Sequence, residues 1–171
     1  MAIETQVTVR LAGLNKMLKS LEHPAQSPEI REMLGKWAVV YRTFLTERFI
    51  RYSQGGGGWP ALKYREPIPG ILWDTGALLG ALSPTDLTAP GGIAEITPDG
   101  TGVRVGFGGP AVHPTAERHG RMTTIAEIAG FHQVGAGNLP IRDAMADPDA
   151  ATINEMATIM RDTLRQIRES S

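Results

Sequence analysis

Cysteine is absent from this chain of 171 residues, which excludes disulfide bonds and thiolate metal sites. Long apolar runs are also absent, and none approaches the ~20 residues that a membrane-spanning helix needs. Neither charge is in excess, since 17 Lys and Arg face 18 Asp and Glu. A protein that coats DNA carries a basic excess, so this balance argues against that class. Residues 1–6 are too polar for a signal peptide. We therefore expect a soluble protein that is made inside the cell and does not associate with membranes.

Patterns typical of catalysis or metal binding are scarce as well. His113, His119 and His132 match no zinc spacing, and no nucleophile motif or carboxylate pair accompanies them. The acidic stretch 143–149 lacks the alternating oxygen ligands and the glycine of a calcium loop. The four glycines at 55–58 lead into no Gly-Lys-Ser/Thr ending, so a phosphate-binding loop is not expected. We predict a protein that is not an enzyme and has no cofactor or metal. A hydrolase that depends on His113 or His119 is the enzymatic alternative.

Hydrophobic residues make up 42% of the chain, which is enough to bury a core. The order of the predicted elements indicates a single α+β domain over residues 1–171. We expect a small, mostly antiparallel sheet that packs against a long helix in the N-terminal half and against a C-terminal helix.

The clearest predicted helix spans residues 28–54. Ser27 can cap it, Pro28 suits its first position, and Gly55 ends it. Apolar residues recur along one face at helical spacing. They are Ile30, Met33, Leu34, Trp37, Tyr41, Phe44, Leu45 and Phe49.

Shorter elements flank this helix. Residues 1–26 are predicted to hold a strand at 7–11 and a short helix at 14–21, from the spacing of their apolar residues. Residues 55–70 form a Gly- and Pro-rich loop, in which the glycines favour a hinge or a close backbone approach. A short helix that Asp74 or Thr75 can cap follows and continues to residue 82.

The second half begins with a predicted β-hairpin, formed by residues 93–97 and 101–107 around Pro98-Asp99-Gly100. Residues 108–122 show no clear period and are interpreted as a surface loop insertion. Thr123 or Thr124 can cap a helix that ends at Gly135.

Two elements are predicted to close the chain. Residues 139–142 could form a short strand. Asp147 and Pro148 can then begin a final helix with an apolar stripe.

Charge is unevenly distributed along the chain. Basic residues dominate between Arg31 and Arg65, whereas residues 66–102 contain acidic residues and neither Lys nor Arg. Opposite charges on separate segments can steer neighbouring subunits, although ordinary solvated surface shows the same pattern. The basic helix 28–54 also leaves open an alternative function as a nucleic-acid-binding module.

Several short motifs occur in a specific order. They are Trp59-Pro60-Ala61-Leu62, Leu72-Trp73-Asp74-Thr75-Gly76-Ala77-Leu78, Val103-Arg104-Val105-Gly106, Phe131-His132-Gln133-Val134-Gly135 and Leu139-Pro140-Ile141-Arg142. With the Gly-rich turn before them and the final helix after them, the set resembles the virion morphogenesis, or tail completion, proteins of Mu-like tailed bacteriophages. The resemblance covers about residues 44–164, and the order of the motifs is more specific than any one of them.

The resemblance implies a structural role at the phage neck, where the head meets the tail. It implies a head–tail connector or tail completion subunit that forms a homo-oligomeric ring around the DNA channel. The implied partners are copies of the chain itself, other neck and tail proteins, and DNA that passes without sequence-specific binding. The implied location is the virion, and the host cytoplasm during assembly.

We predict the subunit and partner interface from the motifs. Tryptophan and arginine are typical interface anchors, and glycine permits close backbone contact. The predicted interface residues are Trp59, Pro60, Leu62, Trp73, Thr75, Gly76, His132, Gln133 and Arg142.

Overall fold

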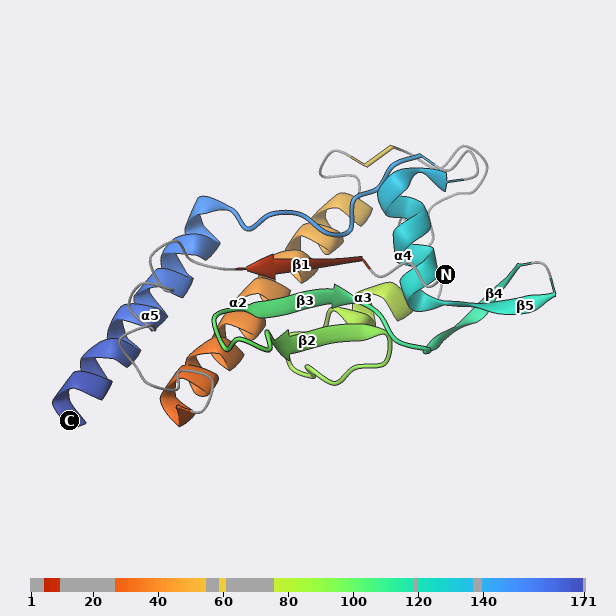
Figure 1. Cartoon of the computed structure of the whole chain (residues 1–171). Coiled ribbons are helices and arrows are strands. Elements are labelled where there is room, and N and C mark those ends of the chain that lie inside the picture. The colour runs from red at the N-terminus through yellow and green to blue at the C-terminus, as the bar shows by residue number, and fades with distance from the viewer. Residues whose placement is uncertain are drawn as a thin grey trace.

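A computed structural model describes residues 5–9, 27–54, 59–60, 76–118, 120–136 and 140–170. Within these ranges the fold is α+β, as predicted, with two small antiparallel sheets and two long helices (Figure 1). The elements in chain order are β1 (Thr5–Val9), α2 (Pro28–Ser53), α3 (Ala77–Ala81), β2 (Gly92–Ile96), β3 (Val103–Phe107), β4 (Val112–Arg118), β5 (Arg121–Thr124), α4 (Ile125–Val134) and α5 (Ala150–Ser170).

The larger sheet has the strand order β1-β3-β2, and both pairings are antiparallel. The predicted hairpin around Pro98-Asp99-Gly100 is confirmed as β2 and β3. Alternate residues of β3 are buried, because Val103, Val105 and Phe107 are at most 1% exposed. On the other face, Arg104 of β3 forms an ion pair of 2.9 Å with Glu95 of β2.

The core lies where α2 packs against β2, β3 and α5. The apolar stripe predicted for residues 28–54 is confirmed, since all but one of its residues are 0% exposed: Ile30, Met33, Leu34, Trp37, Tyr41, Leu45 and Phe49. Phe44, the remaining member, is partly buried and packs against this core. The indole Nε1–H of Trp37 donates a hydrogen bond of 2.9 Å to the carbonyl of Met156 and joins α2 to α5.

Local capping sets three helix boundaries as the sequence predicted. The Ser27 side chain accepts a hydrogen bond from the Ile30 amide at the start of α2. The Thr124 side chain and Glu127 form a reciprocal capping box at the start of α4. Gly135, with φ of 70°, follows the last residue of α4 in the left-handed conformation that glycine favours.

Two predictions near the C-terminus are wrong. Residues 140–142 form no strand, because the Arg142 amide donates to the His132 carbonyl at the end of α4 and so ties this segment to a helix. The final helix begins at Ala150, two residues beyond Pro148. Asp149 caps it in place of Asp147, since its side chain accepts from the Thr152 amide at 2.8 Å.

The surface loop predicted for residues 108–122 is also wrong, because β4 and β5 form a hairpin there. The turn between Arg118 and Arg121 contains Gly120 with φ of 73°, a conformation that suits a tight two-residue connection. A register shift between Val112 and Glu117 makes β4 irregular, which hides any alternating apolar pattern in the sequence. Figure 1 shows this hairpin projecting from the body of the molecule at one end of α4.

Several predictions lie outside the described residues. They include the short helix at 14–21, most of the loop at 55–70, and the capping role of Asp74 or Thr75. The short helix α3 is formed and begins at Ala77, after Gly76.

Candidate functional site

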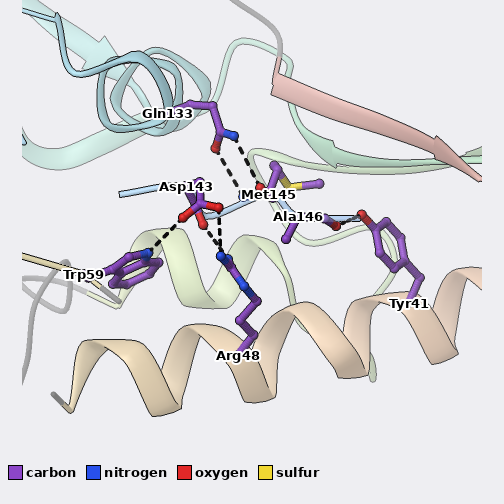
Figure 2. A network of polar contacts seen from close by, with 7 residues as sticks. All are labelled: Tyr41, Arg48, Trp59, Gln133, Asp143, Met145 and Ala146. Carbon is purple, nitrogen blue, oxygen red and sulfur yellow. Dashed lines mark hydrogen bonds and ion pairs between the residues drawn. The ribbon is translucent and has the colours of Figure 1, made fainter. Parts of the chain in front are cut away.

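Three of the predicted motifs meet at residues 140–149, which are part of the connection between α4 and α5. This segment has no regular secondary structure, yet Ala144 is only 2% and Met145 only 3% exposed. Side chains from α2, α4 and residue 59 hold it through a network of polar contacts (Figure 2). We call residues 140–149 the linker segment.

Asp143 is the centre of this network. Its carboxylate Oδ2 lies 2.8 Å from Nη2 of Arg48, and its carbonyl accepts from Nη1 of the same guanidinium. The Arg48 side chain is only 10% exposed, whereas that of Asp143 is 43% exposed. The Arg48 guanidinium also lies 4.5 Å from the centre of the Tyr52 ring, a cation–π geometry.

Trp59 contacts both Asp143 and the aromatic rings near the end of α2. Its indole Nε1–H lies 3.4 Å from Oδ1 of Asp143, and the residue is 6% exposed. Its ring meets the rings of Phe49 and Tyr52 edge-on, with centroids 5.1 and 5.8 Å away. Trp59 is thus an anchor inside the chain.

Gln133 and Tyr41 hold the middle of the linker segment. The Gln133 amide donates to the carbonyl of Met145 at 3.3 Å and accepts from the amide of the same residue at 3.2 Å. The Tyr41 hydroxyl donates to the carbonyl of Ala146. Burial, and secondarily the charge of Asp147, raises the pKa of Tyr41, so the hydroxyl keeps its proton at neutral pH.

Arg142 joins the linker segment to both neighbouring motifs. Its amide donates to the His132 carbonyl at 2.8 Å, and its Nε and Nη2 donate to the Pro60 carbonyl at 3.3 and 3.0 Å. Arg142 is 2% exposed, and burial lowers its pKa. This guanidinium therefore satisfies a backbone carbonyl within the chain.

The nine predicted interface residues fall into three groups. Five of them meet at the linker segment, namely Trp59, Pro60, His132, Gln133 and Arg142. Gly76 lies elsewhere, at the start of α3; its φ of 70° favours glycine, and no described residue beyond its chain neighbours comes within 4 Å of an added Cβ. Leu62, Trp73 and Thr75 lie outside the described residues. A role in binding a second subunit stays a prediction for all nine.

Sequence reasoning missed the residues on the opposite side of these contacts. Tyr41 was assigned to the apolar stripe and Arg48 fell within the basic stretch 31–65, while Asp143 was one member of an acidic stretch. Arg48 and Asp143 are 95 residues apart, and no spacing rule links such a pair. The sequence offered one signal, the polar residues within the motifs, because a polar side chain that is buried usually needs a hydrogen-bond partner.

Arg42 is a second buried guanidinium from the same helix. It is 0% exposed, and its Nη1 donates to the carbonyls of Ser83 and Asp86 at 3.0 and 2.8 Å. Burial lowers its pKa, against the opposing effect of Asp86. Arg42 therefore fastens the loop between α3 and β2 to α2.

Reactive chemistry is not concentrated anywhere in the part of the chain that the structure describes. That part holds no group of three or more His, Cys, Asp or Glu side chains that could bind a metal ion. His113 is 7% exposed, and its Nδ1 accepts from the Thr115 amide at 3.3 Å, while His119 lies outside the described residues. A hollow of about 420 Å³ is lined by Glu47, Ile50, Arg51 and Gln54.

His132 gives this region a pH dependence. Burial, and secondarily the charge of Arg142, lowers the pKa of His132 to about 4, so the imidazole is neutral at pH 7. Its Nδ1 is buried and has no hydrogen-bond partner among the described residues. A proton on this ring would therefore be poorly solvated and would face a guanidinium.

We expect the protein to lose stability as the pH falls from about 6.5 to about 4. The unfolded state binds more protons across this window, because its histidine pKa is about 6.5. The loss assigned to His132 should be about 1–2 kcal/mol, a figure reduced for the partial exposure of the ring. Urea unfolding at a series of pH values checks this, with His132→Gln as the comparison. If both proteins lose the same stability across the window, His132 is not the group responsible.

In the ranges the structure covers, no helix combines the length and the apolar character needed to cross a membrane. Comparisons with protein-family models, with curated proteins and with solved structures found no match.

Proposed function

We propose that this chain is a structural virion protein of a tailed bacteriophage. It acts as a head–tail connector or tail completion subunit and forms a homo-oligomeric ring around the DNA channel. Its partners are further copies of itself and other neck and tail proteins. It resides in the virion, and in the host cytoplasm during assembly, and it is not an enzyme.

One observation carries this proposal. Three stretches of the ordered motif set, around residues 59–60, 132–133 and 142, meet through direct hydrogen bonds and buried contacts. Motifs that define a common fold are expected to meet, because they hold its parts together. The convergence therefore supports reading the set as one structural unit related to the tail completion proteins.

The chemistry of the linker segment supports a structural role as well. Arg142 donates to the Pro60 carbonyl and the Asp143 carboxylate pairs with Arg48 of α2, so both charged groups are engaged within the chain. Such networks fix the position of a chain segment. They suit a subunit whose shape must be maintained in an assembly.

The alternative function, DNA binding through helix 28–54, gains no specific support. Arg42 is buried beneath the α3–β2 loop, and Arg48 is paired with Asp143. Lys36 pairs with Glu32 at 2.8 Å on the helix surface. In a ring, the exposed basic residues need only tolerate passing DNA.

A phage that carries this gene tests the proposal. Deletion of the gene is expected to abolish infectious particles and to leave heads and tails that are unjoined or incompletely finished under the electron microscope. Expression of the intact gene in trans should restore infectivity, and purified virions should contain the protein. Normal yields of infectious virions from the deletion strain would contradict the virion role.

A further inference from the structure

The turn of the β2–β3 hairpin contains a chemically labile peptide bond. Asp99-Gly100 is the one Asp-Gly step in the sequence, and Asn-Gly does not occur. In an Asp-Gly step the backbone nitrogen of the glycine can form a bond to Cγ of the aspartate and expel one side-chain oxygen as water. Glycine favours this attack because it has no Cβ to hinder the nitrogen. The chain therefore carries a site for a slow, spontaneous modification.

The modification ends in an isomer of the same mass. Water opens the cyclic imide at either carbonyl carbon, so the residue returns to aspartate or becomes isoaspartate, in which the main chain runs through the former side-chain carboxyl. One water leaves and one water returns, and no oxidant or cofactor is consumed. The extra backbone carbon of isoaspartate would disturb the pairing of β2 with β3, which positions the buried side chains of Val103 and Val105.

In the folded chain, hydrogen bonds engage both of the reacting groups. The Gly100 amide donates to the Thr97 carbonyl at 2.8 Å, and Gly100 is buried, so the nitrogen is shielded from a base that could take its proton. Oδ1 of Asp99 accepts from the Thr97 hydroxyl at 2.5 Å and from the Thr101 amide at 3.2 Å. Ring closure has to disrupt these bonds, because it consumes the amide proton and reorients the carboxyl group.

Thr97 is the centre of this arrangement. It is 3% exposed, and its hydroxyl accepts from the Gly102 amide at 3.0 Å while it donates to Asp99. Its own amide donates to the Gly102 carbonyl at 2.9 Å. The buried hydroxyl thus joins the base of the turn to the exposed carboxylate of Asp99. A hydrogen bond to a carboxylate is roughly twice as strong as one between neutral groups, so this contact restrains the turn.

We propose that Asp99 is a latent isomerisation site, which the Thr97 hydroxyl keeps unreactive in the folded chain. The Asp99-Gly100 step then reacts only in the small fraction of molecules whose turn is open. Its rate in the folded protein is the rate in a flexible chain multiplied by that fraction. This chemistry does not depend on the proposed virion role, so either proposal can fail without the other. Protection of this kind suits a virion protein, because a released virion cannot replace it.

Storage of the full-length chain at neutral pH tests the proposal. Isoaspartate at position 99 is measured in the tryptic peptide 66–104, by chromatographic separation of isomers of equal mass and by fragmentation in a mass spectrometer. The folded chain is expected to accumulate isoaspartate at least about tenfold more slowly than the same chain in guanidinium chloride. A tenfold ratio corresponds to an opening free energy of about 1.4 kcal/mol.

Thr97→Val removes the hydroxyl and keeps the shape of the side chain. The folded variant is expected to isomerise about fivefold faster than the unmodified chain, because a hydrogen bond to a charged group is lost. Thr97→Ser keeps a hydroxyl and should stay slow. The matched control is Thr152→Val, since Thr152 is 7% exposed and its side chain bonds to Asp149 at the start of α5. This control should isomerise at the unmodified rate.

Three results would overturn the proposal. Equal rates for the folded and the unfolded unmodified chain would mean that the fold gives no protection. Folded Thr97→Val that reacts no faster than the unmodified chain would exclude the role of the hydroxyl. Equal acceleration by Thr97→Val and Thr152→Val would assign the effect to a general loss of stability. Far-UV circular dichroism establishes that each variant is folded before storage, and in guanidinium chloride all the chains should react alike.

Discussion

Trp37→Ala is expected to lower the free energy of unfolding by about 3–5 kcal/mol, the largest single effect that we predict for a side chain. Trp37 is 0% exposed on the face of α2 that packs against α5. Alanine removes most of the buried ring area, leaves a cavity in close-packed surroundings, and removes the hydrogen bond to the carbonyl of Met156. Typical domains are stable by about 5–15 kcal/mol, so this variant should be close to unfolding at 37 °C.

Val39→Ala is the matched control for Trp37→Ala. Val39 lies two residues along the same helix, but its side chain is 39% exposed, so its loss should change stability by less than about 0.5 kcal/mol. Urea unfolding followed by far-UV circular dichroism measures both variants. All samples need the same protein concentration, because self-association would stabilise the folded form by mass action. A Trp37→Ala cost below about 1 kcal/mol would contradict the packing of α2 on α5.

The long elements could be predicted because each carries a strong local signal. The apolar stripe of α2 repeats over about five turns, and the helix starts at a side-chain cap at Ser27. The β2–β3 hairpin has alternating apolar residues around a turn sequence, and α4 has both a capping box and a terminal glycine. In each case the pattern of burial and the turn chemistry agree.

The β4–β5 hairpin could not be predicted in the same way. β4 contains Pro114 and an irregular register, and part of its apolar content faces solvent instead of the core. The alternation rule assumes that apolar residues mark a buried face, and this ribbon violates that assumption. The glycine of its two-residue turn was the one local signal available.

The candidate site shows a different limit of sequence reasoning. Trp59 and Arg142 were selected as anchors of an interface and Gln133 as a further interface residue, and the structure gives each of them a partner within the chain. A side chain that anchors a fold and one that anchors a neighbouring subunit are chosen for the same chemistry, large area and several donors. Residue type alone cannot distinguish these two roles. They differ in which backbone segment the fold brings into contact with the side chain.

The second large effect is expected at the ion pair between α2 and the linker segment. Asp143→Ala should cost about 2–3 kcal/mol, because it leaves the Arg48 guanidinium buried without its carboxylate. The Arg48 side chain is only 10% exposed, and the remaining partners would be the Asp143 carbonyl and the Tyr52 ring. The partial exposure of Asp143 keeps the cost below that of a fully buried pair.

Asp162→Ala is the control, since Asp162 on α5 forms an exposed ion pair with Arg165 at 3.8 Å. Such surface pairs contribute about 0–1 kcal/mol, so this variant should retain nearly all of the stability. A cost for Asp143→Ala no larger than that of Asp162→Ala would show that the Arg48 contact does not hold the linker segment.

A double-mutant cycle separates the pair from its surroundings. Arg48→Met keeps an apolar stem over Tyr52 but removes the buried charge. Combined with Asp143→Ala, it should destabilise the protein by about 1–3 kcal/mol less than the sum of the two single variants, because neither partner is then left alone. Strictly additive costs would mean that Arg48 and Asp143 act independently. The linker segment would then depend on Gln133 and Arg142 for its position.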